Sequence, residues 1–165
     1  MICRFIMLNL SSEILKMFIY YFLFFSRIKN LTYYIFLYFD FLTQKRTKQK
    51  EIYKIVLEAQ ETALAGLRSG MTGAEGDALA RKVIEEAGYG DYFGHGLGHS
   101  VGLEIHEKPA LSPKDQTILR PGIIETVEPG IYIPGLGGVR IEDMTVITEN
   151  GIKNLTSSPK ELIEL

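Results

Sequence analysis

The sequence predicts an α+β domain over residues 48–165, preceded by a hydrophobic segment of different composition. Two stretches with helical periodicity come first and several short β-rich runs follow, an order typical of α+β architecture. All 16 glycines lie at Gly66 or later, and all six prolines lie at Pro109 or later, where turns between strands are needed. With 165 residues, the chain is long enough for one domain of ordinary size.

The hydrophobic segment, residues 1–47, contains thirteen of the 18 aromatic residues. It has no glycine, no proline and no alternation of apolar with polar residues, so its sequence predicts neither turns nor an amphipathic face. A membrane-spanning helix needs about 20 apolar residues, and the run 17–25 has only nine. Membrane contact through residues 17–42 is therefore the less favoured interpretation. The favoured hypothesis is a segment read from a shifted frame of A/T-rich DNA.

Charge and cysteine content exclude several classes of partner. The net charge is −2, from 18 basic and 20 acidic residues, which gives no reason to expect nucleic acid as a partner. Cys3 is the single cysteine, so no disulfide can form within the chain. A reducing, cytoplasmic location fits this cysteine content.

Two amphipathic helices are predicted at the start of the α+β domain. The first starts near Gln49 and ends at Gly70, because glycine readily adopts the left-handed conformation of a helix C-cap. The second starts after Thr72, which forms a capping box with Glu75, and ends at Gly88. The predicted buried residues are Ile52, Val56, Ala59, Ala63 and Leu67 in the first helix and Leu79, Val83 and Ile84 in the second.

Strands and turns follow the second helix. The run Ile123 to Glu128 is rich in β-branched residues and stops at Pro129. Residues 139–147 alternate for part of their length, which predicts one further strand. Asn150-Gly151 is a hairpin turn signal that leads into a last strand.

All three histidines of the chain lie within twelve residues, at His95, His99 and His106. The spacing of His95 and His99 would suit a zinc-protease helix, but the glycines at 94, 96 and 98 argue against a helix there. The alternatives are a glycine-rich loop with surface histidines, or a site for metal binding or proton transfer. Clustered histidines favour the second alternative.

Two carboxylates, Glu128 and Glu142, stand within apolar strand sequence. Burying a carboxylate is costly unless it is paired or bound to a metal. One interpretation is a salt bridge between Glu142 and Arg140, which share a strand face. The other is that Glu128 and Glu142 converge with a histidine on one cation, and this mixture of oxygen and imidazole ligands suits Mn, Co, Zn or Fe.

Four motifs, at 94–99, 102–107, 126–134 and 137–143, together resemble the pita-bread metallopeptidases. Within that family they are most similar to the Xaa-Pro aminopeptidases and prolidases, over residues 49–165. The resemblance implies the second half of a pita-bread (creatinase/aminopeptidase-like) domain. It also implies metal-dependent release of N-terminal residues before proline from short peptides. Aminopeptidase and dipeptidase activity both stay open, as does homo-oligomerisation.

The resemblance further implies two metal ions held by two Asp, one His and two Glu ligands. It places His99, Glu128 and Glu142 among these ligands, with Glu142 bridging the ions. The two Asp ligands would precede Gln49, but no matching motif stands there, and Asp40 is not assigned. We therefore expect at most one ion, Mn or Co before Zn or Fe, and weak or no activity. The rival function is a non-catalytic remnant or a membrane-tethered binding fragment.

Three other residues receive roles from the resemblance. His106 would hydrogen-bond the substrate, and His95 would line the substrate pocket. Arg140 would hold the metal ligands in place without binding the metal itself. Ser100 and Glu125 depart from the family pattern. Strand alternation puts Glu125 on the face opposite the metal ligands, where an apolar residue is expected.

Overall fold

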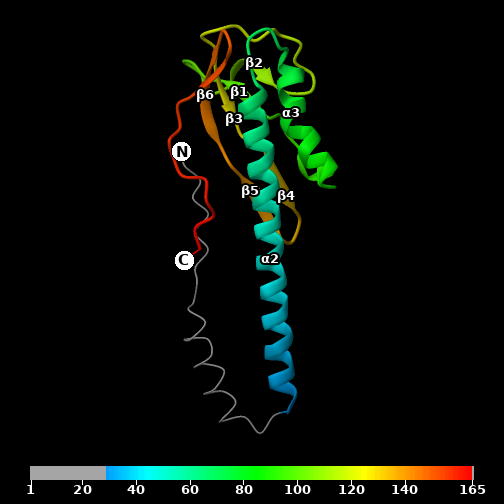
Figure 1. Ribbon diagram of the computed structural model, residues 1–165. Helices are drawn as coiled ribbons and strands as arrows, with labels where there is room; N and C mark the ends of the chain where they lie inside the picture. Colours follow the sequence, from blue (N-terminus) through cyan, green and yellow to red (C-terminus); the bar gives the residue numbers. More distant parts are fainter. Residues whose placement is uncertain (1–28, 165) are drawn as a thin grey trace.

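The computed structural model describes residues 29–164, with side chains from residue 43 onward (Figure 1). Cys3 and most of the predicted hydrophobic segment lie outside the described residues. The helices are α2 (Lys29–Gly66), α3 (Gly73–Glu86) and the short 3-10 helix η1 (Gly90–Tyr92). The strands are β1 (Gly98–Ser100), β2 (Glu107–Leu111), β3 (Ile124–Val127), β4 (Gly130–Ile133), β5 (Gly137–Arg140), β6 (Asp143–Thr148) and β7 (Gly151–Asn154).

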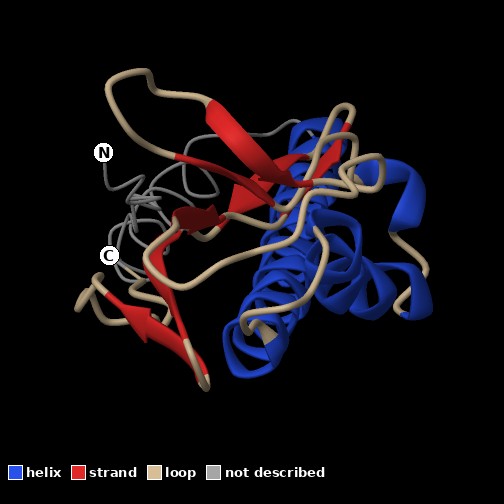
Figure 2. Cartoon of the chain, turned by 90° about the horizontal axis from the view of Figure 1, so that it is seen from above, coloured by secondary structure: helices blue, strands red, loops and turns tan. Residues whose placement is uncertain are grey.

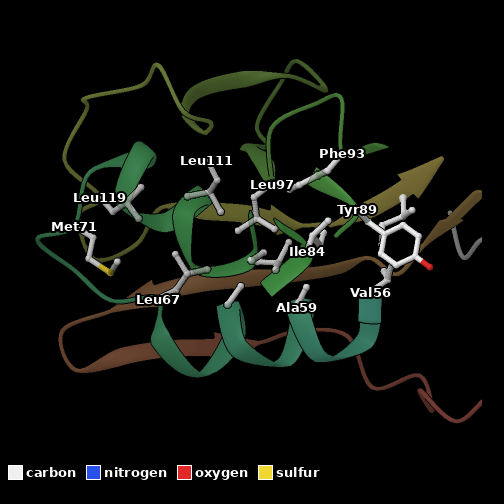
Figure 3. Packing of buried hydrophobic residues seen from close by; sticks show 14 of the residues in the cluster. Val56, Ala59, Leu67, Met71, Ile84, Tyr89, Phe93, Leu97, Leu111 and Leu119 are labelled. Atoms are coloured by element: carbon white, nitrogen blue, oxygen red, sulfur yellow. The ribbon is translucent and has the colours of Figure 1, made fainter. Parts of the chain in front are cut away.

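The described strands form two antiparallel sheets, and the long helices gather on one side of them (Figure 2). The larger sheet has the order β2-β1-β3-β6-β7, and β4 pairs with β5 in a two-stranded sheet. The hydrophobic core lies where α2, α3 and the larger sheet meet, around Leu67, Ile84 and Leu97 (Figure 3). The predicted α+β class is confirmed, because the two long helices precede the strands of two antiparallel sheets.

Helix α2 is longer at its start and shorter at its end than predicted. It begins at Lys29 instead of near Gln49, because no glycine or proline interrupts that stretch, and its N-terminal part extends beyond the sheet (Figure 1). It ends at Gly66, and Gly70 takes the predicted left-handed conformation, with φ +88°, in the turn that follows. The predicted buried face is correct: Ile52, Val56, Ala59, Ala63 and Leu67 are at most 1% exposed.

No helix within residues 29–164 combines the length and apolar character needed to cross a lipid bilayer.

Helix α3 has the predicted capping box but a different buried face. The Thr72 hydroxyl accepts a hydrogen bond from the Glu75 amide at 3.1 Å, and the Glu75 carboxylate accepts one from the Thr72 amide at 2.7 Å. The predicted Leu79 and Val83 are only partly buried. Ile84 is buried as predicted, and the other buried positions are Gly73, Gly76, Asp77 and Ala80.

The small residues on this face allow close packing of α3 against its neighbours. A Cβ at Gly76 would stand 2.9 Å from Leu111 and 3.0 Å from Leu67, too close for an ordinary contact. The glycine that weakens the helix locally therefore lets α3 approach the core closely.

The run 139–147, predicted as one strand, is two strands. β5 ends at Arg140 and β6 begins at Asp143, because β5 pairs with β4 while β6 pairs with β3. The chain changes sheets between them, which leaves Glu142 outside both strands. The hairpin at Asn150-Gly151 is confirmed by the pairing of β6 with β7.

Candidate active site

His99 lies in the middle of β1, beside β3 in the larger sheet. The approach of the two strands depends on Gly98, because a Cβ at this position would collide with the backbone carbonyl of Thr126. Gly96 and Gly98 therefore serve close packing, and the segment is not helical, as predicted.

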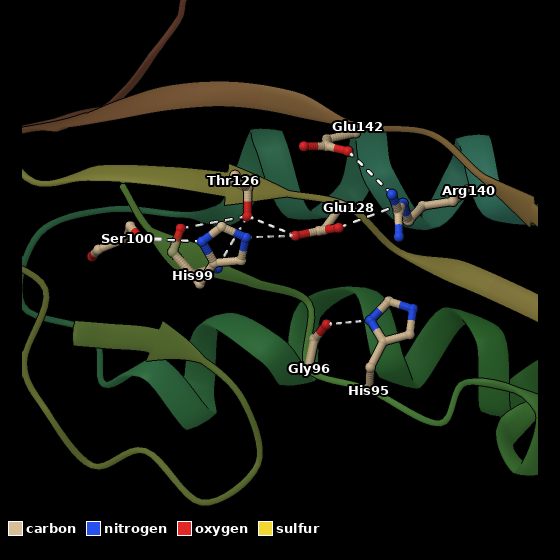
Figure 4. Close-up of polar contacts among 8 residues, drawn as sticks. All are labelled: His95, Gly96, His99, Ser100, Thr126, Glu128, Arg140 and Glu142. Carbon is tan, nitrogen blue, oxygen red and sulfur yellow. Dashed lines mark hydrogen bonds and ion pairs between the residues drawn. The ribbon is translucent and has the colours of Figure 1, made fainter. Parts of the chain in front are cut away.

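His99, Thr126 and Glu128 form a hydrogen-bonded cluster (Figure 4). Nε2 of His99 lies 3.2 Å from Oε1 of Glu128. The Thr126 hydroxyl accepts a hydrogen bond from the His99 amide at 3.0 Å and donates one to Oε1 of Glu128 at 2.9 Å. Thr126 was not identified from the sequence, although its position two residues before Glu128 puts it on the same strand face.

Arg140 lies between the two glutamates (Figure 4). Its Nε is 3.5 Å from Oε2 of Glu128, and its Nη2 is 3.7 Å from Oε2 of Glu142. Burial acts to lower the pKa of Arg140, but Tyr132 and the two carboxylates outweigh it and raise this pKa above its ordinary value. The predicted salt bridge between Glu142 and Arg140 is therefore present, and the same guanidinium also reaches Glu128.

Of the three proposed metal ligands, His99 lies in β1, Glu128 follows β3 and Glu142 precedes β6, and they are only partly assembled. The register pairs Val127 with Asp143, so Glu128 and Glu142 occupy adjacent positions just beyond that pair. Within residues 43–164, no three His, Cys, Asp or Glu side chains are close enough together to hold a metal ion. His99 and Glu128 fit a divalent cation as donors. Glu142 could join them only by leaving Arg140.

The other two histidines flank this cluster. The ring of His106 lies on an exposed loop, with its centroid 4.2 Å from that of His99. The ring of His95 packs against Phe93 and Tyr132, at centroid distances of 5.1 and 5.6 Å. Nδ1 of His95 contacts the Gly96 carbonyl, and Nε2 is buried with no hydrogen-bond partner among residues 43–164. Their predicted roles toward a substrate stay proposals.

Ser100 and Glu125 are hydrogen-bonded partners. They face one another across β1 and β3, and the Ser100 hydroxyl donates a hydrogen bond to Oε1 of Glu125 at 2.8 Å. Glu125 is completely buried, and its Oε2 has no hydrogen-bond partner in the described part of the chain. Burial raises the pKa of Glu125 to about 8, against the opposing effect of the Ser100 hydrogen bond.

This raised pKa predicts a pH-dependent stability. The folded protein binds the Glu125 proton more tightly than the unfolded chain, whose ordinary pKa is 4.5. The contribution of the Glu125 proton to the stability of the folded protein is therefore complete below pH 4.5 and is lost as the pH rises through about 8. We expect the free energy of unfolding to fall across this window, with a limiting slope of about 1.4 kcal/mol per pH unit.

Glu125→Gln keeps the shape of the side chain and removes its titration, so the variant should lose this slope. Denaturant unfolding of both proteins from pH 5 to pH 8 measures the difference. Equal slopes in the two proteins would contradict a protonated Glu125.

Comparison with known proteins places these residues in a family. The model of metallopeptidase family M24 matches residues 25–149, which include part of the hydrophobic segment. The Xaa-Pro dipeptidase of Pyrococcus furiosus is 60% identical over 116 residues, covering 70% of this chain and 33% of that protein. The chain thus spans about a third of the length of the curated relatives that it matches.

Solved structures agree with this assignment. An Xaa-Pro dipeptidase from Bacillus anthracis superposes with a TM-score of 0.71 at 59% identity, covering 72% of this chain and 33% of that one. An X-Pro aminopeptidase from Thermotoga maritima superposes with a TM-score of 0.69 at 47% identity, covering 72% of this chain and 33% of that one.

The predicted division of the chain at residue 47 remains a prediction.

Proposed function

Because this chain belongs to metallopeptidase family M24, we propose that it forms the metal-binding part of a peptidase that releases N-terminal residues preceding proline. The contact of His99 with Glu128 carries the proposal, because it sets an imidazole nitrogen 3.2 Å from a carboxylate oxygen. The names of the relatives support the substrate class, and they include both Xaa-Pro dipeptidases and an X-Pro aminopeptidase. Both activities therefore remain within the proposal.

His99 and Glu128 would hold one divalent cation, with Thr126 fixing the carboxylate through its hydrogen bond to Oε1. Glu142 would join them on release from Arg140, which would then neutralise the remaining charge of Glu128. Mn or Co is the preferred ion, with Zn or Fe as alternatives. A cation bound there would lower the pKa of a bound water and stabilise negative charge on the attacked carbonyl group.

The histidines beside the cluster would bind the peptide. His106 lies against His99 and is exposed, so it can hydrogen-bond a substrate carbonyl next to the cation. His95 stands between two aromatic rings, and these present an apolar surface suited to a proline ring.

A binding measurement tests the substrate class without requiring turnover. The zinc-loaded chain is titrated with glycyl-proline and with glycyl-glycine while the histidine ring signals are followed by NMR. We expect the His95 and His106 signals to shift with glycyl-proline at concentrations where glycyl-glycine has little effect, because only the proline ring contacts the aromatic pair. Equal responses to the two dipeptides, or none to either, would contradict the proposed specificity.

One observation favours the rival function, a non-catalytic binding fragment. Arg140 already lies within 4 Å of both carboxylates that should hold the cation, at 3.5 and 3.7 Å. A guanidinium in this position competes with a metal ion for the same oxygens. Binding of glycyl-proline by the metal-free chain, as tight as by the metal-loaded chain, would support this alternative.

A further inference from the structure

A buried ion pair lies on helix α3, outside the His99 cluster. Nε of Arg81 is 2.6 Å from Oδ2 of Asp77, and Nη2 is 3.0 Å from Oδ1, so the pair is bidentate. The side chain of Asp77 is 1% exposed and that of Arg81 is 19% exposed. Because desolvation offsets most of the attraction in such a pair, stability alone is a weak explanation for its presence.

The ion pair is bonded to the glycine-rich segment that carries His95. Arg81 donates to the carbonyl oxygen of Phe93 at 3.1 Å and to that of His95 at 2.7 Å. Oδ1 of Asp77 accepts a hydrogen bond from the Leu97 amide at 2.9 Å. The two side chains therefore satisfy backbone polar groups at three alternate residues of this segment.

The peptide group between Gly96 and Leu97 connects Asp77 to the His95 ring. Its N–H donates to Asp77, and its carbonyl oxygen lies 2.7 Å from Nδ1 of His95. The N–H and C=O of a trans peptide point in opposite directions, so Asp77 fixes this peptide from one side and the ring contacts it from the other. An anionic acceptor on the N–H also strengthens the carbonyl as an acceptor.

This contact determines which nitrogen of His95 carries the proton. A carbonyl oxygen can only accept a hydrogen bond, so Nδ1 of His95 must be the donor. In the neutral ring, Nε2 is then unprotonated, and within the described part of the chain no group donates to it. In water, a neutral histidine side chain prefers the proton on Nε2, so this tautomer is imposed by the fold.

We propose that Asp77 and Arg81 are positioning residues for His95. They orient the peptide between Gly96 and Leu97, which holds the ring in the Nδ1–H tautomer and leaves Nε2 as a buried, unprotonated acceptor. The inference does not rest on the proposed peptidase function, because its readout is the protonated nitrogen of the ring.

The test is NMR of the full chain labelled with ¹⁵N-histidine, at a pH where the rings are neutral. In the wild type, we expect the Nδ1 signal of His95 in the range of a protonated nitrogen and Nε2 in that of a bare one. Asp77→Ala should convert His95 to a mixture dominated by the Nε2–H tautomer. Asp77→Asn keeps an oxygen that can accept from Leu97, so it should largely restore the original tautomer.

Two controls distinguish a specific effect on His95 from a general destabilisation of the fold. Lys82→Met breaks the exposed ion pair with Glu86 on the same helix, at 3.7 Å, and should leave His95 unchanged. His99 is an internal reference, because its Nδ1 contacts the Ser100 carbonyl at 3.1 Å. Its signals should stay constant in all variants.

Three outcomes would overturn the proposal: an Nε2 proton on His95 in the wild type, no tautomer change in any variant, or equal changes at His95 and His99. If Asp77→Ala does not fold, Arg81→Lys decides. This variant keeps the charge but cannot donate to both carbonyls and to Asp77 as the planar guanidinium does. It should therefore shift His95 toward the Nε2–H tautomer.

Discussion

The chain, purified with Mn or Co, is expected to hydrolyse an Xaa-Pro dipeptide at least about 10²–10³ times more slowly than its dipeptidase relatives. The resemblance implies five ligands for two ions, and we expect from the sequence that this chain supplies three of them, His99, Glu128 and Glu142. Loss of one stabilising interaction with the oxyanion already costs about 10²–10³ in rate, and loss of a metal with its bound water costs more.

The measurement is release of proline from an Xaa-Pro dipeptide, with the Pyrococcus furiosus relative as the positive control. Glu142→Gln distinguishes true turnover from contamination, because it removes the proposed bridging ligand and nearly preserves side-chain volume. Turnover close to that of the relative, lost in Glu142→Gln, would show that the site is completed by ligands that we have not identified.

Local sequence signals predicted the elements that depend on local contacts. The capping box at Thr72 and Glu75 and the hairpin at Asn150-Gly151 each involve residues close together in sequence, and both are present. The buried face of α2 followed from apolar spacing, which reports directly on one side of a helix.

The features missed from the sequence depend on tertiary partners. Asp77 and Arg81 are four residues apart, a spacing usually found in exposed helix ion pairs, and only the glycine-rich segment packed over them makes them buried. Residues 139–147 alternate as one strand would, and the break before Asp143 arises because the chain changes sheets.

The sequence indicated which residue types form the candidate site, but it did not predict how their side chains are arranged. The sequence brought His99, Glu128 and Glu142 together as donors, and the fold places them on adjacent strands or just beyond them. It could not predict that Arg140 lies between the two glutamates, because the distances of 3.5 and 3.7 Å depend on side-chain rotamers.

The second prediction concerns metal binding by these residues. We expect the chain to bind one divalent ion at most. His99→Ala should weaken this binding by more than about 100-fold, because loss of a residue that only hydrogen-bonds to a metal ligand already weakens metal binding about 10–100-fold. His99 supplies the only nitrogen donor beside Glu128 within the described cluster, so the remaining carboxylates would be left with Arg140 as their partner. Glu149→Gln, in the exposed turn before β7, is the matched control and should bind as the wild type does.

The proposal that His99 and Glu128 bind one cation together is tested most directly by titrating the metal-free chain with Co²⁺ and counting the bound ions by native mass spectrometry. The wild type and Glu149→Gln should each take up one ion, while His99→Ala and Glu128→Gln should take up none at the same concentration. Uptake of one ion by His99→Ala with unchanged affinity, or of two tightly held ions by the wild type, would contradict this assignment.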